Sequence, residues 1–504
     1  MGIVFNIGTH RPGLCNLDVL DRTQMNLQLI IFVGYFLLVF GIGWISMKLT
    51  RSEKDYWIAG GKLGWGIGGA TMAATHTSAG TFIGTIGVIY AVGWSFGWVL
   101  LVIPLAYWFM VAVLAPRFTK VTELTLPAFL QRRYQSKTAR GIGAVIILIA
   151  TVVYIQAQIV AGGLVSNIVF GVDPTTGMII FTIILLAYTL VGGMLAVAYT
   201  DFLQMIIMIV GTLVSVPLMI NHFSGLADLV EKVELIKPLT FDWGGFPTVL
   251  LITLSLAFFL GSVATPEKVV RLYAMKDMRS IRKAMLLTIV VVTGLNLLVF
   301  ILGLGAMTLF PNLPTGDLAM PIIAKAVLPS FIGTIMLAAV TSAMMSTVDS
   351  LLLVAGSALS EDIYQNLLHK NASRSRRLLI ARIGILIVGI LPLISILSGL
   401  AKGELIQFIV VLFTAIMGAG FFTPVVGGVL WKRATKQGAI ASMIGGVTVT
   451  ALWKAFGDPL IYPVLPGFVV SVLSYIIVSY LTTPPDESAW KPYFDTEKQT
   501  HEDE

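Results

Sequence analysis

An apolar stretch between residues 338 and 364 carries polar side chains that could bind a cation. Ser346, Thr347, Asp349 and Ser350 stand within about one turn of one another if the stretch is helical. Hydroxyls and an ionisable carboxylate are costly in hydrocarbon unless they face a partner or a water-filled cavity. Ligation by oxygen alone suits a small alkali or alkaline-earth cation rather than zinc or copper. These residues therefore predict a cation site inside an apolar helix.

The composition predicts that most of the chain lies in a membrane. Hydrophobic residues make up 57% of the 504 residues and charged residues only 12%, whereas about 25% of a typical soluble protein is charged. Apolar stretches of about 20 residues, which can cross a bilayer, recur about thirteen times. They lie near 26–47, 64–90, 94–114, 140–166, 177–196, 201–220, 246–264, 285–309, 331–356, 378–398, 404–430, 438–455 and 461–482. We predict an all-α integral membrane protein.

The positions of Lys and Arg predict how the helices are oriented. One side of the predicted topology holds 26 of the 33 basic residues, in segments 48–63, 115–141, 266–284, 361–383, 431–437 and the C-terminal tail. Because basic loops stay in the cytoplasm, we expect a multi-pass protein of the cell membrane with its N-terminus outside and its C-terminus inside. The net charge of +7 mostly reflects this bias. Basic residues scattered over short loops argue against a nucleic-acid partner, and the single cysteine, Cys15, excludes a cysteine-based metal cluster.

Two of the predicted helices contain residues that should interrupt them. Residues 68–93 combine six glycines with many hydroxyl groups, and residues 254–272 contain Gly261, Ser262, Thr265 and Pro266 before an expected basic loop. Unwound backbone is tolerated in a membrane only where it lines a cavity. The two interruptions lie five helices apart, as expected for two inverted five-helix repeats with broken first helices.

We predict that the chain has six parts. They are an extracellular N-terminus (1–25), a leading helix and loop (26–63), inverted repeat 1 (64–220), inverted repeat 2 (246–430), two further helices (431–482) and a polar, mobile cytoplasmic tail (483–504).

The chain resembles the sodium:solute symporter family along nearly its full length. The most specific matches are YTLVGGMLAVAYTDFLQ (188–204) and MSTVDSLLLVAGSALSEDIY (345–364), supported by ATHTSAGTFIG (74–84) and TVTALWKAFGDPLIYPVLPGF (448–468). The resemblance implies a sodium ion between the broken first helix of the core and the third helix of the second repeat. Its ligands would be the carbonyls of Ala74, Thr77 and Ala343 and the hydroxyls of Ser346 and Thr347. With no formal charge among these ligands, binding should be weak and reversible.

The resemblance also implies a possible second cation or proton site. Some family members hold a second sodium with positions that match Asp201, Ser346 and Ser350, and Asp349 replaces a further serine of that site. Asp201 could instead cap the N-terminus of a helix, and Asp349 could face a structural partner.

The substrate side departs from the pattern of the proline carriers. His76 replaces an Asp, Gly80 a Trp and Ser262 an aromatic residue, whereas Tyr154 and Phe258 keep an aromatic side chain. The candidate substrate residues are His76, Ser78, Thr81, Tyr154, Gln158, Phe258 and Ser262. We expect no arginine in the pocket, so half-helix N-termini would attract an anionic solute.

The resemblance implies a sodium-coupled symporter that imports a small, carboxylate-bearing solute by alternating access, for example an amino acid such as proline, pantothenate or a monocarboxylate. A proton-coupled symporter is the alternative, for which His76, Asp201 and Asp349 are the hints. A channel is less well supported because no symmetric filter motif is visible. Without an HExxH or GxSxG motif, we do not expect an enzyme. The expected partners are sodium, the solute and the lipid bilayer, and such folds can work as monomers.

Overall fold

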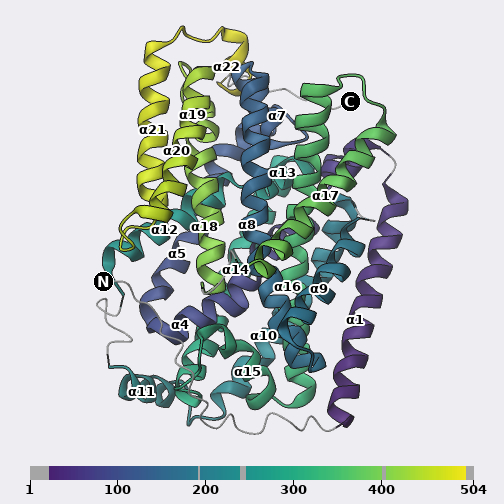
Figure 1. The fold of residues 1–504 in the computed structure, drawn as a ribbon, viewed down its shortest axis with the longest axis vertical. Helices are drawn as coiled ribbons and strands as arrows, with labels where there is room; N and C mark the ends of the chain where they lie inside the picture. The colour runs from purple at the N-terminus through teal and green to yellow at the C-terminus, as the bar shows by residue number, and fades with distance from the viewer. Residues whose placement is uncertain (1–21, 51, 191–192, 239–245, 400–403, 495–504) are drawn as a thin grey trace.

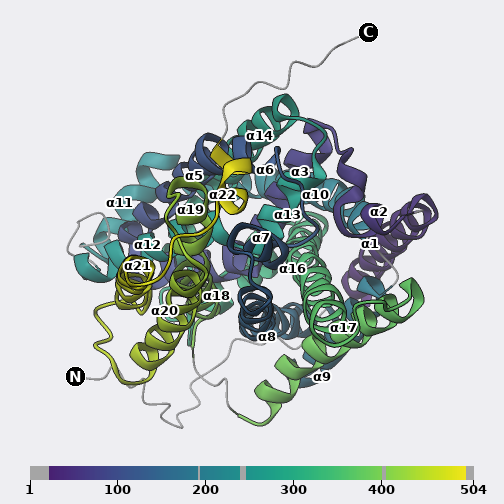
Figure 2. The same cartoon turned by 90° about the horizontal axis from the view of Figure 1, so that it is seen from above.

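The computed structural model describes residues 22–50, 52–190, 193–238, 246–399 and 404–494. Its long helices run roughly along one axis and form a bundle (Figure 1), with α16 surrounded by other helices when viewed from above (Figure 2). Among the described residues, eleven helices are long and apolar enough to cross a membrane. The described part contains no β-strand, and Leu63 and Met275 form an isolated bridge. An all-helical membrane protein is therefore confirmed, whereas the count of thirteen stays a prediction.

The first half of the chain contains the elements up to α11. They are α1 (Arg22–Leu49), α2 (Glu53–Ile58), α3 (Trp65–His76), α4 (Ile86–Val92), α5 (Gly97–Phe109), α6 (Ala115–Phe118), α7 (Leu126–Tyr134), α8 (Lys137–Phe170), α9 (Pro174–Thr189), α10 (Met194–Ile220) and α11 (Leu226–Ile236).

The second half contains the elements from α12 onwards. They are α12 (Thr248–Ala264), α13 (Pro266–Ala274), α14 (Met278–Leu309), α15 (Ala319–Ile322), α16 (Ser330–Ser357), α17 (Arg374–Leu397), α18 (Ile406–Met417), α19 (Thr423–Leu430), α20 (Lys436–Phe456), α21 (Val464–Leu481) and α22 (Glu487–Phe494).

Both expected helix interruptions are present. Helix α3 ends at His76, and the next residue, Thr77, has an extended backbone. Helical structure resumes as a π-helical segment over Gly80–Thr85 that leads into α4. Thr265 is also extended and separates α12 from α13, with Pro266 at the first position of α13, where its missing N–H costs nothing. The breaks thus match the sequence prediction, while the inverted relation of the two repeats stays a prediction.

The segment after the second break corrects one expectation. Residues 266–274 were expected in a basic loop, but they form α13, which continues the apolar span 248–274 into the bundle. Lys268 and Arg271 are therefore buried, with 5% and 1% of their surface exposed. These two charges belong to the interior rather than to a loop.

Helix α16 forms the centre of the bundle. Every residue from 336 to 357 is buried, and the helix packs against α10, α8, α17, α1 and α3. This complete burial explains how its hydroxyl and carboxylate groups can face protein partners rather than lipid. Helical structure continues as a π-helical segment over Ala358–Leu368.

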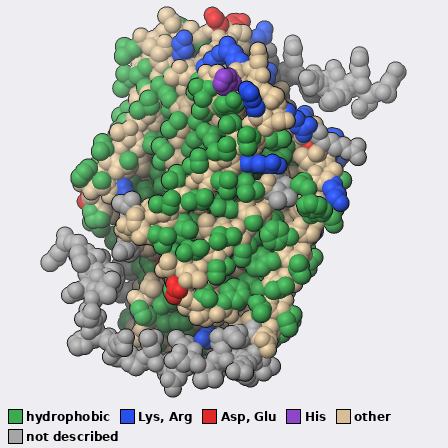
Figure 3. All heavy atoms as spheres, turned by 45° about the vertical axis from the view of Figure 1, so that its right-hand side comes forward, with side chains coloured by type: hydrophobic (Ala, Val, Ile, Leu, Met, Phe, Trp, Pro, Cys, Tyr) green, Lys and Arg blue, Asp and Glu red, His purple; other side chains and the backbone are tan. Residues whose placement is uncertain are grey.

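The outer surface has the character of a membrane protein. Large hydrophobic side chains are exposed on α1, α10, α17 and α21, among other helices. Figure 3 shows a broad apolar surface on the face that it draws. In that view Lys and Arg gather towards one end of the molecule. The chain is therefore a multi-pass membrane protein.

The C-terminal region is more ordered than we expected. Residues 483–504 were expected as a mobile tail, yet residues 487–494 form α22, which packs against α7 and α19. Tyr493 has 1% of its surface exposed, and its ring lies edge-on to that of Phe129 at 5.5 Å. Burial of an aromatic side chain fixes this segment.

Candidate functional site

The five oxygens expected to bind sodium converge where α3 ends against α16. The Ser346 hydroxyl donates a hydrogen bond to the Ala74 carbonyl at 3.0 Å and lies 3.2 Å from the Ala343 carbonyl. The Thr347 hydroxyl lies 3.2 Å from the Thr77 carbonyl and 3.0 Å from the Ala343 carbonyl. The helix break frees the Ala74 and Thr77 carbonyls from α-helical bonding, so that α16 can reach them.

A further oxygen that the sequence did not suggest joins this group. The Thr75 carbonyl lies 3.2 Å from the Thr347 hydroxyl. The Thr77 hydroxyl is buried without a hydrogen-bond partner. All of these groups are neutral oxygens, the ligand type that a hard monovalent cation prefers.

A buried arginine lies next to this cluster. Arg271 donates a hydrogen bond from Nη2 to Asp201 Oδ2 at 3.0 Å and to Ser350 Oγ at 2.6 Å, and from Nε to Thr71 Oγ1 at 3.0 Å. Thr71 in turn donates to Asp201 Oδ2 at 2.5 Å. The guanidinium thus contacts Asp201 and Ser350, two of the four residues proposed for a second cation site. A fixed positive charge therefore lies at that site.

The remaining two members of that proposed site face elsewhere. The Ser346 hydroxyl belongs to the first cluster. Asp349 accepts a hydrogen bond of 3.4 Å from Ser350, its Oδ2 is buried without a partner, and the residue lines a cavity beside α1. Asp201 lies well inside α10, which begins at Met194, so it does not cap that helix.

A small cavity lies between the two helix breaks. Its volume is about 40 Å³, which is room for a few water molecules. Six of the seven candidate substrate residues line it, namely His76, Ser78, Thr81, Tyr154, Phe258 and Ser262. Thr75 and Thr347 belong to the same wall. The cavity and the oxygen cluster therefore share Thr75 of α3 and Thr347 of α16.

The seventh candidate, Gln158, supports the break instead. Its Oε1 accepts a hydrogen bond from the backbone N–H of Ala79 at 3.0 Å, and it does not belong to the cavity lining. A buried backbone donor left free by an interrupted helix needs such a partner.

Unsatisfied polar atoms are concentrated around the cavity. His76 Nδ1, Ser262 Oγ, Glu267 Oε2, Asn296 Nδ2 and Gln407 Oε1 are buried without a hydrogen-bond partner, and all five residues line it. Because buried polar groups in folded proteins nearly always have partners, this concentration indicates a site for a polar ligand. Aromatic side chains complete the wall, with the rings of Tyr154 and Phe413 in edge contact at 4.7 Å.

Comparison with known proteins identifies the class of this molecule. The profile of the sodium:solute symporter family matches residues 56–446. The chain belongs to the sodium:solute symporter family. It is therefore a sodium-coupled symporter and not an enzyme.

The symporter has relatives of similar length among bacterial transporters. It is 30% identical over 495 residues to the osmoregulated proline transporter OpuE of Bacillus subtilis, covering 94% of this chain and 99% of the relative. It is 32% identical over 479 residues to the high-affinity proline transporter PutP of Bacillus subtilis, covering 91% and 99%.

Solved structures share the fold of the symporter. A Na⁺-coupled sialic acid symporter in a substrate-bound outward-open state superimposes with a TM-score of 0.80 at 18% identity, covering 91% of this chain and 98% of that one. The nucleobase-cation-symport-1 transporter Mhp1 gives a TM-score of 0.56 at 12% identity, covering 88% and 99%.

Three charged residues of the symporter's interior were missed from the sequence. Glu267, Lys268 and Arg271 were assigned to a basic loop, and no arginine was expected near the site. In the structure Glu267 and Lys268 line the cavity and Arg271 contacts Asp201. A usable signal was present: Thr-Pro-Glu at 265–267 is a typical helix start, which predicts a new helix rather than a loop.

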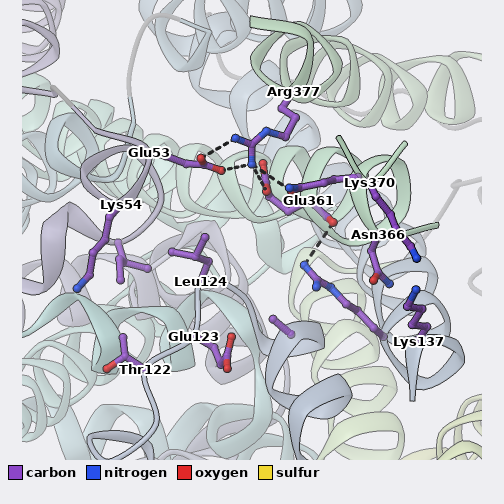
Figure 4. A pocket seen from close by; sticks show the side chains of 14 residues that line it. Glu53, Lys54, Thr122, Glu123, Leu124, Lys137, Glu361, Asn366, Lys370 and Arg377 are labelled. Atoms are coloured by element: carbon purple, nitrogen blue, oxygen red, sulfur yellow. Dashed lines mark hydrogen bonds and ion pairs between the residues drawn. The ribbon is translucent and has the colours of Figure 1, made fainter. Parts of the chain in front are cut away.

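The symporter has a second, larger cavity of about 770 Å³ bordered by α2, α7, α8 and α17. Figure 4 shows Arg377 of α17 reaching between Glu53 of α2 and Glu361. Arg377 forms a bidentate pair with Glu53 at 2.5 and 2.7 Å and lies 3.2 Å from Glu361. One arginine thus joins three separate elements at this end of the bundle.

Proposed function

We propose that the symporter uses the sodium gradient to import a small, carboxylate-bearing solute, such as an amino acid like proline, pantothenate or a monocarboxylate. The observation that carries this proposal is the wall shared by the oxygen cluster and the cavity, to which both Thr75 and Thr347 belong. Two relatives that are proline transporters add weight to an amino-acid substrate.

The shared wall suggests how ion and solute binding are coupled. Sodium would be held by Ala74, Thr77, Ala343, Ser346 and Thr347, whose oxygens already meet through hydrogen bonds. The ion would draw the end of α3 against α16 and so fix Ser78 and Thr81, which line the cavity. A solute that binds this ordered wall would favour sodium binding by the same free energy. External sodium would bind first, and the membrane potential would drive release to the inside.

The buried arginine bears on the number of ions. A second sodium near Asp201 and Ser350 would have to displace the Arg271 guanidinium, which contacts both. We therefore propose that one sodium ion is transported per cycle, bound by the oxygen cluster that contains Ala74 and Thr347. Asp349 keeps one oxygen without a partner, and it is the residue that a proton or a second cation would use.

The charge distribution supports the proposed orientation in the cell membrane. After Lys268 and Arg271 are removed from the loops, the remaining basic residues still gather towards one end of the molecule (Figure 3). That end would be cytoplasmic, with the N-terminus outside and the C-terminus inside. The symporter would function as a monomer.

Uptake into proteoliposomes tests the proposal. Labelled proline, pantothenate, pyruvate, lactate and acetate would each be offered with and without an inward sodium gradient. Accumulation of one solute that requires the sodium gradient is the expected result. Uptake of that solute driven equally well by a proton gradient without sodium would contradict it.

A further inference from the structure

Two opposite charges stand side by side at the start of α13. Glu267 and Lys268 are its second and third residues, are 4% and 5% exposed, and both line the cavity between the helix breaks. Burying a charge is costly unless it is paired. Within the described part of the chain, neither residue belongs to an ion pair, and Glu267 Oε2 has no hydrogen-bond partner.

The other charged groups nearby are already engaged. Arg271 contacts Asp201, Ser350 and Thr71 through its side chain, and its Nη1 donates to the Glu267 backbone carbonyl at 2.8 Å rather than to the carboxylate. The cavity therefore presents one carboxylate and one ammonium group that are both available to a ligand.

We propose that the transported solute is a zwitterionic amino or imino acid, whose ammonium group binds Glu267 and whose carboxylate binds Lys268. This inference rests on the proposed function and narrows its substrate class. A solute with a carboxylate alone would pair with Lys268 and leave Glu267 as an uncompensated buried charge. A solute with an amine alone would leave Lys268 unpaired. Only a zwitterion satisfies both groups.

The rest of the cavity wall is partly apolar. Leu100, Ile103 and Val410 line it together with the rings of Tyr154, Phe258 and Phe413. His76 and Gln407 add unpartnered polar atoms. Because the cavity is small, we expect compact amino and imino acids rather than long ones.

Matched analogues test the proposal on the wild-type protein. Two sets of nearly equal shape are L-proline, cyclopentanecarboxylate and pyrrolidine, and L-alanine, propionate and ethylamine. Each compound would be tested as a competitor of sodium-dependent uptake in proteoliposomes. Each would also be tested for sodium-dependent thermal stabilisation of the purified protein. We expect one of the two zwitterions to inhibit uptake and to stabilise the protein at a concentration about 30-fold lower than its carboxylate-only and amine-only analogues do.

Two variants test the residues. Glu267→Gln should reduce the discrimination between the zwitterion and its carboxylate-only analogue, whereas Lys268→Gln should weaken binding of both by about 30-fold. The controls make the same two substitutions at exposed positions. They are Glu231→Gln on α11 and Lys276→Gln in the loop between α13 and α14. The ratio of the affinities for the zwitterion and its carboxylate-only analogue is informative. If Glu267 had only a structural role, its substitution would lower both affinities equally.

The outcomes separate this inference from the proposed function. Sodium-driven uptake of a monocarboxylate in preference to its zwitterionic analogue would overturn the zwitterion proposal and leave the symport of a carboxylate intact. An unchanged discrimination ratio in Glu267→Gln would also overturn it. Sodium-independent behaviour of every solute would overturn both proposals.

Discussion

The hydroxyl of Thr347 lies 3.2 Å from the carbonyl oxygen of Thr77, across the point where α3 ends. Thr347 also lines the cavity between the two helix breaks. One side chain of the central helix thus contacts both the backbone that would hold sodium and the space that would hold the solute. This contact gives a physical path for coupling, since whatever moves the Thr77 carbonyl also moves the cavity wall.

The Asp201–Arg271 pair should be essential to the stability of the bundle. Both side chains are fully or almost fully buried, and removing one partner of such a pair costs about 3–5 kcal/mol because the other charge stays buried. We expect Arg271→Gln to lower the melting temperature of detergent-purified protein strongly. The double variant Asp201→Asn/Arg271→Gln should recover much of that loss. Equal destabilisation by the single and double variants would contradict the pairing.

The residues that matched sequence motifs of the family could be grouped from the sequence. The resemblance to the family grouped Ser346 and Thr347 with Ala74 and Thr77, and the structure shows these residues in contact. Their role in binding sodium stays a prediction. Asp201 was assigned to a possible second cation or proton site, with a helix cap as the alternative. Its contact with Arg271 was missed because Pro266 was taken as the end of a helix rather than the start of α13.

Elements that depend on distant contacts could not be predicted in this way. Residues 487–494, expected in a mobile tail, form a helix in which Tyr493 packs against Phe129, more than 300 positions earlier in the chain. Gln158 was expected in the cavity but binds the backbone of Ala79. In both cases the partner, and not the local sequence, determines the structure.

The ion pairs of Arg377 should hold the α2 end of the bundle closed. Arg377 of α17 joins Glu53 of α2 to Glu361 and Gln365 of the π-helical segment Ala358–Leu368. We expect Arg377→Met to increase access to the cavity in Figure 4, measured as a several-fold faster reaction of Ala128→Cys with a membrane-impermeant thiol reagent in a Cys15→Ser background.

The matched control for this experiment is Arg132→Met. Arg132 pairs with Glu123 at 3.0 Å, but its side chain is 53% exposed, and such surface pairs contribute at most about 1 kcal/mol. If the Arg132 variant reacted as fast as the Arg377 variant, a gating role for Arg377 would be unsupported.

Asp317 should make stability depend on pH. The residue lies outside the membrane-spanning helices and accepts a hydrogen bond from the Ile406 N–H at the start of α18. Burial raises the pKa of its carboxyl to about 7, although the Ile406 N–H lowers it. An acid with a raised pKa in the folded state binds more protons there than when unfolded, so its contribution to stability falls as the pH rises from about 4 to 7.

The variant Asp317→Asn removes this titration and keeps an acceptor for the Ile406 N–H. We expect its melting temperature to exceed that of the wild type at pH 8 and to differ less at pH 5. Asp228→Asn, on the exposed helix α11, is the control. A wild-type and an Asp317→Asn protein with parallel pH profiles would show that Asp317 does not titrate in this range.

The sodium dependence of uptake by Thr347→Ala and Ser346→Ala tests the central claim most directly. With the transported solute at saturation, the sodium concentration for half-maximal uptake should rise about tenfold or more, equivalent to ~1.4 kcal/mol, while the half-saturating solute concentration at high sodium changes far less. Thr341→Ala and Ser357→Ala, whose hydroxyls donate to carbonyls of α16 itself, should behave like the wild type. An unchanged sodium requirement in both site variants would contradict the assignment of the sodium site.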